Sequence, residues 1–342
     1  WETSEQTDVG LDLYFFDNRL ALEADYYIKT TKGLLVDAPI PGTVGNNAPT
    51  VNGGEVRNKG IELALTYSGN INDFSYRTSI NGSFNRNEVL SINNAEGVLI
   101  GANFATYGIV SRSIPGQPFA YFWGYETDGI FQNAEEVASY KNSSGALIQP
   151  NAQPGDIRFR DLNGDGKITD DDRTNIGNPT PKMVLGYNLD LKYKNFDLSA
   201  FFNGAFGHQI FNGTRRHDLV TSNMHSKFLN RWTGEGSSDK YPRFTWNDSN
   251  GNYTRISDIY IEDGDYVRLK TLQVGYNFSG NTLSKIYLSN MRVYVSADNL
   301  LTFTEYTGFD PEIGARSTLD IGVDRGIYPQ ARIFRVGLNA TF

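Results

Sequence analysis

Twelve residues near the middle of the chain have the types and the spacing of a calcium-binding loop. They read Asp161-Leu-Asn-Gly-Asp-Gly-Lys-Ile-Thr-Asp-Asp-Asp172. Gly166 stands at the sixth position, where such a loop turns sharply. Ca²⁺ is a hard ion that takes about 6–8 oxygen ligands, so the sequence predicts a calcium site here. The expected ligands are the side chains of Asp161, Asn163, Asp165 and Asp172 and the backbone carbonyl of Lys167.

Two features of this loop set the role that we expect for it. Its last ligand is Asp172 rather than Glu, so the bidentate reach is shorter and a lower affinity is expected. No strongly amphipathic helix flanks the loop, which favours an isolated loop over a paired EF-hand sensor. The alternative interpretation is a solvated, acidic, glycine-rich turn. A bound Ca²⁺ would be structural and would hold a long surface loop in place.

Histidine and tryptophan residues give weaker indications of chemistry. The histidines are His208, His217 and His225. Their spacing matches no zinc signature, so solvated loop residues are expected. Trp123 and Trp232 are weak candidates for substrate binding, because an indole ring can stack on a sugar. Packing in loops or in an interfacial aromatic girdle is the more frequent role for such residues.

Three carboxylates near the end of the chain could form the acid pair of a glycosidase. These residues are Glu305, Asp310 and Glu312. No surrounding motif supports catalysis, and Asp310-Pro311-Glu312 is typical of a structural turn. The sequence therefore predicts no enzyme activity.

Composition excludes several classes of protein. The chain has 342 residues and a net charge of −8, which argues against nucleic-acid binding. It has no Cys, which excludes disulfides and thiolate metal sites. No run approaches the ~18 apolar residues of a membrane helix, and the mean hydropathy is −0.43. Aromatic residues make up 13% of the chain, a share that suits the girdles of a membrane β-barrel. No signal peptide is visible, so we expect either a processed chain or the tail of a longer one.

The last twelve residues alternate between apolar and mostly polar side chains, as a strand with two different faces does. One face would carry Phe334, Val336, Leu338, Ala340 and Phe342, and the other Ile333, Arg335, Gly337, Asn339 and Thr341. A tilted strand of about 9–11 residues crosses a bilayer. The segment is therefore interpreted as the closing strand of an outer-membrane β-barrel.

Similar alternation predicts about eleven antiparallel strands in an all-β chain. They are expected at 6–16, 19–30, 57–68, 74–85, 104–112, 120–126, 185–193, 196–203, 264–278, 291–299 and 331–342. Short and long connections alternate along the chain, as the periplasmic turns and extracellular loops of outer-membrane barrels do. The long loop 128–182 carries the calcium-type loop 161–172. Single-chain bacterial barrels have even strand numbers, so residues 1–342 are interpreted as the C-terminal half of a larger barrel.

The segment Asp298-Asn-Leu-Leu-Thr-Phe-Thr-Glu-Tyr-Thr-Gly-Phe-Asp-Pro-Glu312 resembles the signature near the end of SusC/RagA-type TonB-dependent transporters of Bacteroidetes outer membranes. Further similarity to this family lies in Trp1-Glu-Thr with the hairpin after it, Asn58-Lys-Gly-Ile-Glu62, Gly124-Tyr-Glu-Thr-Asp-Gly-Ile-Phe131, Arg231-Trp-Thr233 and Tyr328-Pro-Gln-Ala-Arg332. The resemblance covers the whole chain in one order.

This resemblance implies a barrel of about 22 strands with an N-terminal plug, of which the present strands would be half. It implies nutrient import of a glycan or peptide substrate with a SusD-like lipoprotein lid, in the outer membrane of a Gram-negative cell. Energy would come from the TonB-ExbB-ExbD system through a plug region, but neither a plug nor a TonB box lies in these residues. The sequence leaves the choice between glycan and peptide open.

A second class of function remains as the alternative. A secreted, soluble, calcium-stabilised β-sandwich that binds carbohydrate would also have alternating strands. The outward face of the strands distinguishes a membrane barrel from a soluble sandwich. The wall of a barrel exposes an apolar face to lipid, whereas a sandwich buries its apolar faces.

Overall fold

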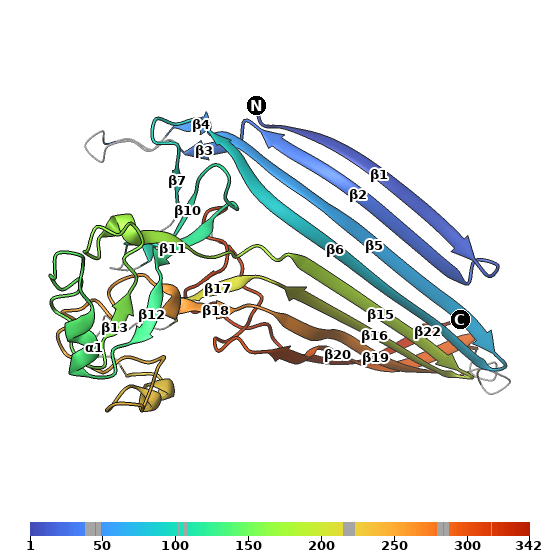
Figure 1. The fold of residues 1–342 in the computed structure, drawn as a ribbon. Helices are drawn as coiled ribbons and strands as arrows, with labels where there is room; N and C mark the ends of the chain where they lie inside the picture. Colours follow the sequence, from blue (N-terminus) through green and yellow to red (C-terminus); the bar gives the residue numbers. More distant parts are fainter. Residues whose placement is uncertain are drawn as a thin grey trace.

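The computed structural model describes the whole chain except residues 38–44, 46–48, 102, 105–107, 215–222, 279–282, 284–286 and 316. Its main element is a nine-stranded sheet in the order β1-β2-β5-β6-β15-β16-β19-β20-β22 (Figure 1). All neighbouring strands in it are antiparallel. The strands are β1 (Thr3–Phe15), β2 (Leu20–Lys32), β5 (Gly54–Ile71), β6 (Phe74–Ile92), β15 (Met183–Tyr193), β16 (Phe196–Phe206), β19 (Tyr266–Phe278), β20 (Asn290–Thr304) and β22 (Ile333–Thr341).

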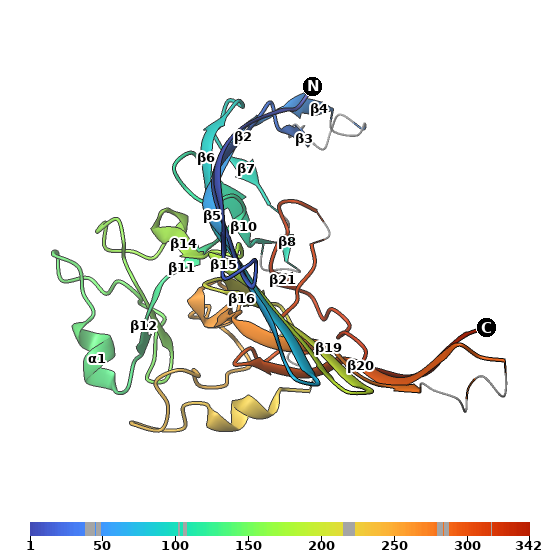
Figure 2. The same ribbon diagram turned by 90° about the vertical axis from the view of Figure 1, so that its right-hand side faces the viewer.

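The sheet has two chemically different faces. Its outer face is apolar and exposed, as the terminal strand illustrates: Val336 is 80% exposed and its partner Val295 in β20 is 53% exposed. Its inner face carries polar side chains such as Gln273, which lies in register with Ser199 and Ser296. Figure 2 shows the sheet as a curved wall that has β1 at one edge and β22 at the other. The expected all-β, antiparallel fold class is confirmed, and a β-sandwich with a buried apolar face is set aside.

The connections between the nine strands alternate strictly in length, as the sequence predicts. The short ones lie at one end of the sheet and the long ones at the other (Figure 1). Tight turns at the short end place non-glycine residues in the left-handed region, with φ +52° at Asn72 and +50° at Lys194. No described helix is long and apolar enough to cross a membrane.

The count of about eleven strands needs a correction. Segment 120–126 and the described part of segment 104–112 are not in the main sheet but contribute to small sheets at the long-loop end. Residues 105–107 of the predicted strand lie outside the described residues. The apolar residues of segment 120–126 do not face lipid, because this segment is buried on both faces: Tyr121 is 1%, Phe122 0% and Tyr125 7% exposed. A run of apolar residues cannot by itself distinguish a lipid-facing strand from one inside a protein core.

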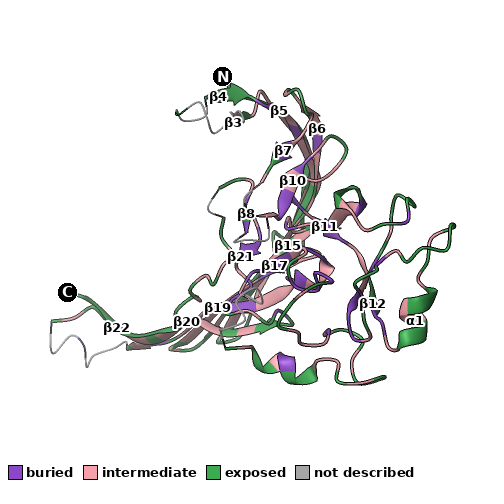
Figure 3. Ribbon diagram, turned by 90° about the vertical axis from the view of Figure 1, so that its left-hand side faces the viewer, coloured by how far each residue is buried: buried purple, intermediate pink, exposed green. Residues whose placement is uncertain are grey.

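The long connections fold together into a lobe with its own hydrophobic core. Figure 3 shows buried segments concentrated in this lobe, whereas most residues of the sheet are intermediate or exposed. Phe122 of β11 packs with Phe211 of β17 and Val323 of β21, residues that are far apart in sequence. The core cluster comprises Phe104, Val110, Phe122, Phe211, Ile256, Tyr260 and Val323. The lobe is therefore one packed body and not a set of independent loops.

The lobe contains short elements. Its strands, together with the hairpin β3–β4 at the same end, are β3 (Leu35–Asp37), β4 (Thr50–Asn52), β7 (Leu99–Ile100), β8 (Asn103–Phe104), β9 (Gly108–Ile109), β10 (Ser111–Ser113), β11 (Tyr121–Tyr125), β12 (Thr127–Ile130), β13 (Ile157–Phe159), β14 (Arg173–Gly177), β17 (Gln209–Asn212), β18 (Ile261–Asp263) and β21 (Val323–Asp324). Its helices are α1 (Ala134–Ser139) and the 3₁₀ turns η2 (Asp170–Asp172), η3 (Ser226–Asn230) and η4 (Asp258–Tyr260). The stretch Asn133–Tyr140, with Glu135 and Glu136 near its start, predicts a short helix in the long loop. Helix α1 confirms it, and the Asn133 side chain accepts a hydrogen bond from the Glu136 amide.

Two adjacent residues of β19 test the assignment of the outer face. Val274→Arg would place a charge on the apolar face, which costs about 2–4 kcal/mol near the middle of a bilayer. Gln273→Arg is the matched control, because it adds the same side chain to the polar inner face. The free energy of unfolding of the full-length protein in phospholipid vesicles, measured by urea titration, should fall only for Val274→Arg. Equal losses in the two variants would contradict the assignment.

Candidate functional site

The predicted calcium loop adopts the backbone turn that its glycines require. Gly164 and Gly166 have φ of +73° and +83°, in the region that favours glycine. The Asp161 carboxylate accepts hydrogen bonds from both of their amides at 2.8 Å. Asn163 and Asp165 each accept from the amide two residues later, at 2.8 and 2.9 Å. These hydrogen bonds hold the first half of the loop in a tight coil.

Asp172 closes the loop. Asp172 is fully buried, with 0% of its surface exposed. One carboxylate oxygen accepts from the amides of Leu162 and Asn163 at 2.9 and 3.3 Å, and the other accepts from Thr169 at 2.7 Å. The two ends of the loop are therefore joined through this one carboxylate.

The fit of the loop to a metal ion is mixed. The donor types are those that Ca²⁺ prefers, and the backbone turn is the expected one. However, the described residues contain no group of three or more His, Cys, Asp or Glu side chains that could hold a metal ion. The carboxylates point at backbone amides in this arrangement. Calcium binding stays a prediction.

The two tryptophan candidates are engaged in contacts within the protein. The Arg112 guanidinium lies 3.2 Å from the centroid of the Trp123 ring and covers one of its faces. Trp232 donates from Nε1 to Gln132 at 3.2 Å and packs against Gly155, where a Cβ would lie 2.4 Å from the ring. These contacts favour structural packing, and stacking on a substrate stays a prediction for both rings.

The histidines do not all lie where the sequence suggests. His208 is only 7% exposed, so the expectation of a solvated residue is wrong there, because the lobe packs over it. Burial lowers the pKa of His208 below its usual value, although the nearby Asp265 and Asp263 oppose this effect. His225 is exposed, and its Nδ1 accepts from the Lys227 amide at 3.2 Å. His217 lies outside the described residues.

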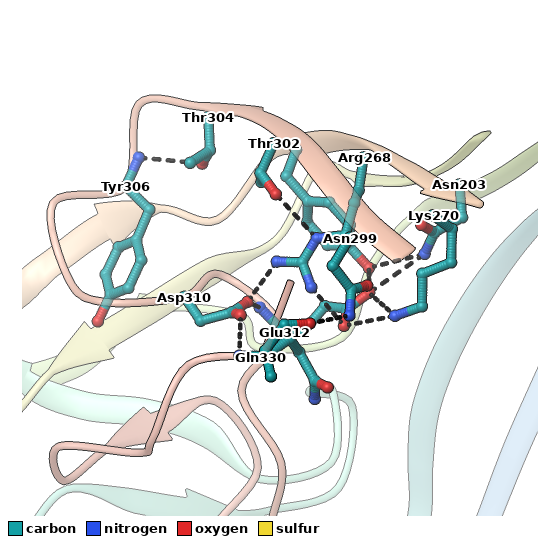
Figure 4. Close-up of polar contacts among 12 residues, drawn as sticks. Asn203, Arg268, Lys270, Asn299, Thr302, Thr304, Tyr306, Asp310, Glu312 and Gln330 are labelled. Atoms are coloured by element: carbon teal, nitrogen blue, oxygen red, sulfur yellow. Dashed lines mark hydrogen bonds and ion pairs between the residues drawn. The ribbon is translucent and has the colours of Figure 1, made fainter. Parts of the chain in front are cut away.

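A charged cluster on the inner face is the main feature that the sequence did not reveal (Figure 4). We call Arg268, Lys270, Asp310 and Glu312 the Arg268 cluster. Arg268 is 2% exposed and its guanidinium lies 2.6 Å from Asp310 Oδ1 and 3.0 Å from Glu312 Oε2. Lys270 Nζ lies 3.1 Å from Glu312 Oε2. In the sequence, only the segment Asp310-Pro311-Glu312 pointed to this site. Arg268 could not be distinguished from the other charged residues in the predicted strands.

The Arg268 cluster attaches the last loop, residues 305–332, to the inner face of the sheet. Asp310 also accepts from the Gln330 amide at 2.9 Å. Within the last loop, the Tyr306 hydroxyl donates to Asp324 at 2.6 Å. Asp310 and Glu312 are therefore bound to cations and amides, which agrees with a structural turn, and Glu305 is exposed.

The pKa of Asp310 follows from these contacts. Burial acts to raise it, but hydrogen bonds from the Gln330 and Glu312 amides and from Arg268 outweigh burial and lower the pKa. The folded-state pKa thus lies below the unfolded value of about 3.9. The stabilisation is fully present above that value and is lost as the pH falls through the folded-state pKa.

Comparison with known proteins gives a consistent result. A family model described as "TonB dependent receptor-like, beta-barrel" matches residues 1–300. The chain is 37% identical to TonB-dependent receptor P3 from Formosa agariphila, in an alignment that covers the whole of this chain and 34% of that receptor. It is 24% identical to TonB-dependent receptor SusC from Bacteroides thetaiotaomicron, in an alignment that covers the whole of this chain and 32% of that receptor. The chain therefore spans about a third of the length of these curated relatives.

A solved structure shares the fold. The structure described as the RagAB peptide transporter superimposes with a TM-score of 0.77 at 24% sequence identity. The match covers 100% of this chain and 36% of that one.

Removal of Asp310 tests the role of the Arg268 cluster. Asp310→Ala leaves the buried guanidinium without one of its two carboxylates, and breaking a buried ion pair costs about 3–5 kcal/mol. Hydrogen exchange of amides in residues 305–332 of the full-length protein should accelerate. Glu305→Ala, which removes an exposed carboxylate from the same loop, is the control and should leave exchange unchanged. Unaltered protection in Asp310→Ala would show that the cluster does not hold the loop.

Proposed function

Because the chain belongs to the TonB-dependent receptor-like β-barrel family, of the SusC/RagA type and located in the outer membrane of Gram-negative bacteria, we propose that it forms part of the barrel of a nutrient importer. Members of this family are transporters and receptors, so the chain is not an enzyme. The proposed process is active import of oligosaccharides or oligopeptides, driven by the TonB-ExbB-ExbD system. By analogy with RagAB and SusC, a SusD-like surface lipoprotein would act as lid and partner.

One observation carries the proposal: a single curved sheet that is apolar outside and polar inside. The inner face includes an asparagine network in which Asn85 and Asn87 both donate to Asn58 Oδ1, at 3.2 and 2.9 Å. The Tyr27 hydroxyl donates to Asn85 at 3.0 Å, and Asn87 accepts from the Phe119 amide of the lobe at 2.7 Å. Such a face suits a path for hydrated solutes, whereas the outer face suits lipid.

The division of roles follows from the fold. The lobe formed by the long connections stands at one end of the wall, where it can meet a substrate and a partner. Its packed core gives these connections a fixed arrangement, and the Arg268 cluster fixes the last loop against the wall. Movement of a plug would then open the polar path, a step that belongs to a part of the protein beyond these residues.

We propose in addition that the loop 161–172 binds a structural Ca²⁺. The spacing of its oxygen donors and the positive φ angles of its glycines support this. The ligands would be Asp161, Asn163, Asp165, the Lys167 carbonyl and Asp172. The double positive charge of the ion would offset part of the negative charge of the three carboxylates. An extracellular loop can use a site with a dissociation constant of about 10⁻⁴–10⁻³ M.

Co-purification tests the importer. The full-length protein, tagged in its native outer membrane and extracted in detergent, should be recovered with a stoichiometric surface lipoprotein and a retained oligosaccharide or peptide. Uptake of that cargo by cells should stop when TonB is deleted, because the barrel has no energy source of its own. Recovery of the protein alone from the soluble fraction would contradict the proposal.

Chelation tests the calcium loop. EDTA should increase proteolysis between residues 128 and 182 in the wild type, and added Ca²⁺ should reverse the effect. Asp165→Ala should be cut with and without EDTA, since it removes a ligand. Asp128→Ala, which removes a carboxylate outside the loop, should behave like the wild type. A cleavage pattern that resists EDTA would count against calcium.

A further inference from the structure

A pocket lies on the inner face, between the last loop and the wall of the sheet. Its volume is about 400 Å³, which is within the range of small-ligand sites. The last loop contributes Pro311, Ile313 and Ile321, and the other side includes Pro179 and Ile210. Ala205 and Tyr266 of the barrel strands also line it and are paired in register. The surface of the pocket is therefore mostly aliphatic.

The polar groups that line the pocket differ in whether they are free to bind a ligand. Glu312 borders the pocket, but Arg268, Lys270 and the Tyr266 hydroxyl already bind its carboxylate. His208 also lines the pocket and is 7% exposed. Its Nδ1 has no hydrogen-bond partner in the described part of the chain and lies 3.9 Å from Asp265 Oδ1, beyond hydrogen-bonding distance. A buried nitrogen without a partner carries a cost that a bound group can remove.

The Arg268 cluster holds the loop side of this pocket next to the sheet. The cluster holds Glu312, and the next residues, Ile313 and Gly314, form the loop side of the pocket. The wall side is set by backbone pairing of β16 with β19. Because both sides are fixed before anything binds, an occupant does not have to order them.

The lining indicates the chemistry of the occupant. A sugar ring carries hydroxyl groups around its edge, and each one that is buried without a partner is costly. This pocket offers one imidazole and a surface of Ile and Pro. A branched aliphatic side chain would gain from burial here, and a neighbouring peptide N–H or carbonyl could reach the imidazole.

We propose that this pocket is a specificity subsite that receives an aliphatic side chain of a peptide cargo. The proposal rests on the proposed import function and chooses between its two cargo classes. Ile313, Ile321 and His208 are the residues that would set the preference.

The test uses the detergent-purified full-length protein with the lipoprotein that accompanies it. It is incubated with short peptides from a casein digest or with maltodextrin oligosaccharides, washed, and the retained molecules are identified by mass spectrometry. The retained pool should be peptides enriched in Val, Leu or Ile. Ile313→Trp fills the pocket and should reduce that enrichment about tenfold or more. Thr318→Trp, an exposed position of the same loop outside the lining, is the matched control and should retain the preference.

A second variant tests the subsite in case Ile313→Trp disturbs folding. Ile313→Ala enlarges the pocket, so the retained peptides should shift towards Phe and other larger side chains. Retention of oligosaccharides, absence of retained peptides, or an unchanged preference in both Ile313 variants would overturn the subsite. Uptake that still requires TonB under those outcomes would leave the import function standing. Uptake that is independent of TonB would overturn the import function itself.

Discussion

The pairing of backbone amides across a curved sheet is the constraint on which the rest of this structure depends. In hydrocarbon, no water is available to hydrogen-bond a free N–H or C=O, so membrane strands must satisfy each other. Residue-by-residue registers such as that of β15 with β16 meet this requirement. Once the register is set, alternate side chains fall on opposite faces, and a slip of one residue would exchange the lipid-facing and solute-facing sets. The position of every inner-face residue follows from this pairing.

The lobe follows a different physical rule. Its segments are too short and irregular to be held by a large sheet, so they depend on a hydrophobic core of aromatic and aliphatic side chains contributed by distant parts of the chain. Phe211 packs against Phe104, Phe122 and Tyr260, with ring centroids 5.2, 6.1 and 5.4 Å away. This packing explains how long connections, which would otherwise be costly to order, acquire a fixed shape at one end of the wall.

The Arg268 cluster joins these two regions. A buried guanidinium is stable only when its charge is paired and its donors are used, and Arg268 meets both conditions with Asp310, Glu312 and Thr302. The cluster holds the last loop against the sheet, and the loop in turn forms one side of the pocket that contains His208. An ion pair with no catalytic role can thereby determine which groups fit at the inner face.

The alternating side chains of the terminal strand and of similar segments along the chain predicted an all-β antiparallel fold, because side-chain alternation is a local property of a strand. The alternation of short and long connections, and helix α1 with its Asn133 cap, were predictable for the same reason. Residues 120–126 were misassigned because burial on both faces depends on partners such as Phe211, which lie far away in sequence. Arg268 was missed, and His208 was wrongly expected to be solvated, because a charge or an imidazole in a strand or loop has no local mark of its partners. The local chemistry of strands and turns was determined by the sequence alone, and only the tertiary structure decided which distant residues meet at the inner face, because that depends on strand order and register.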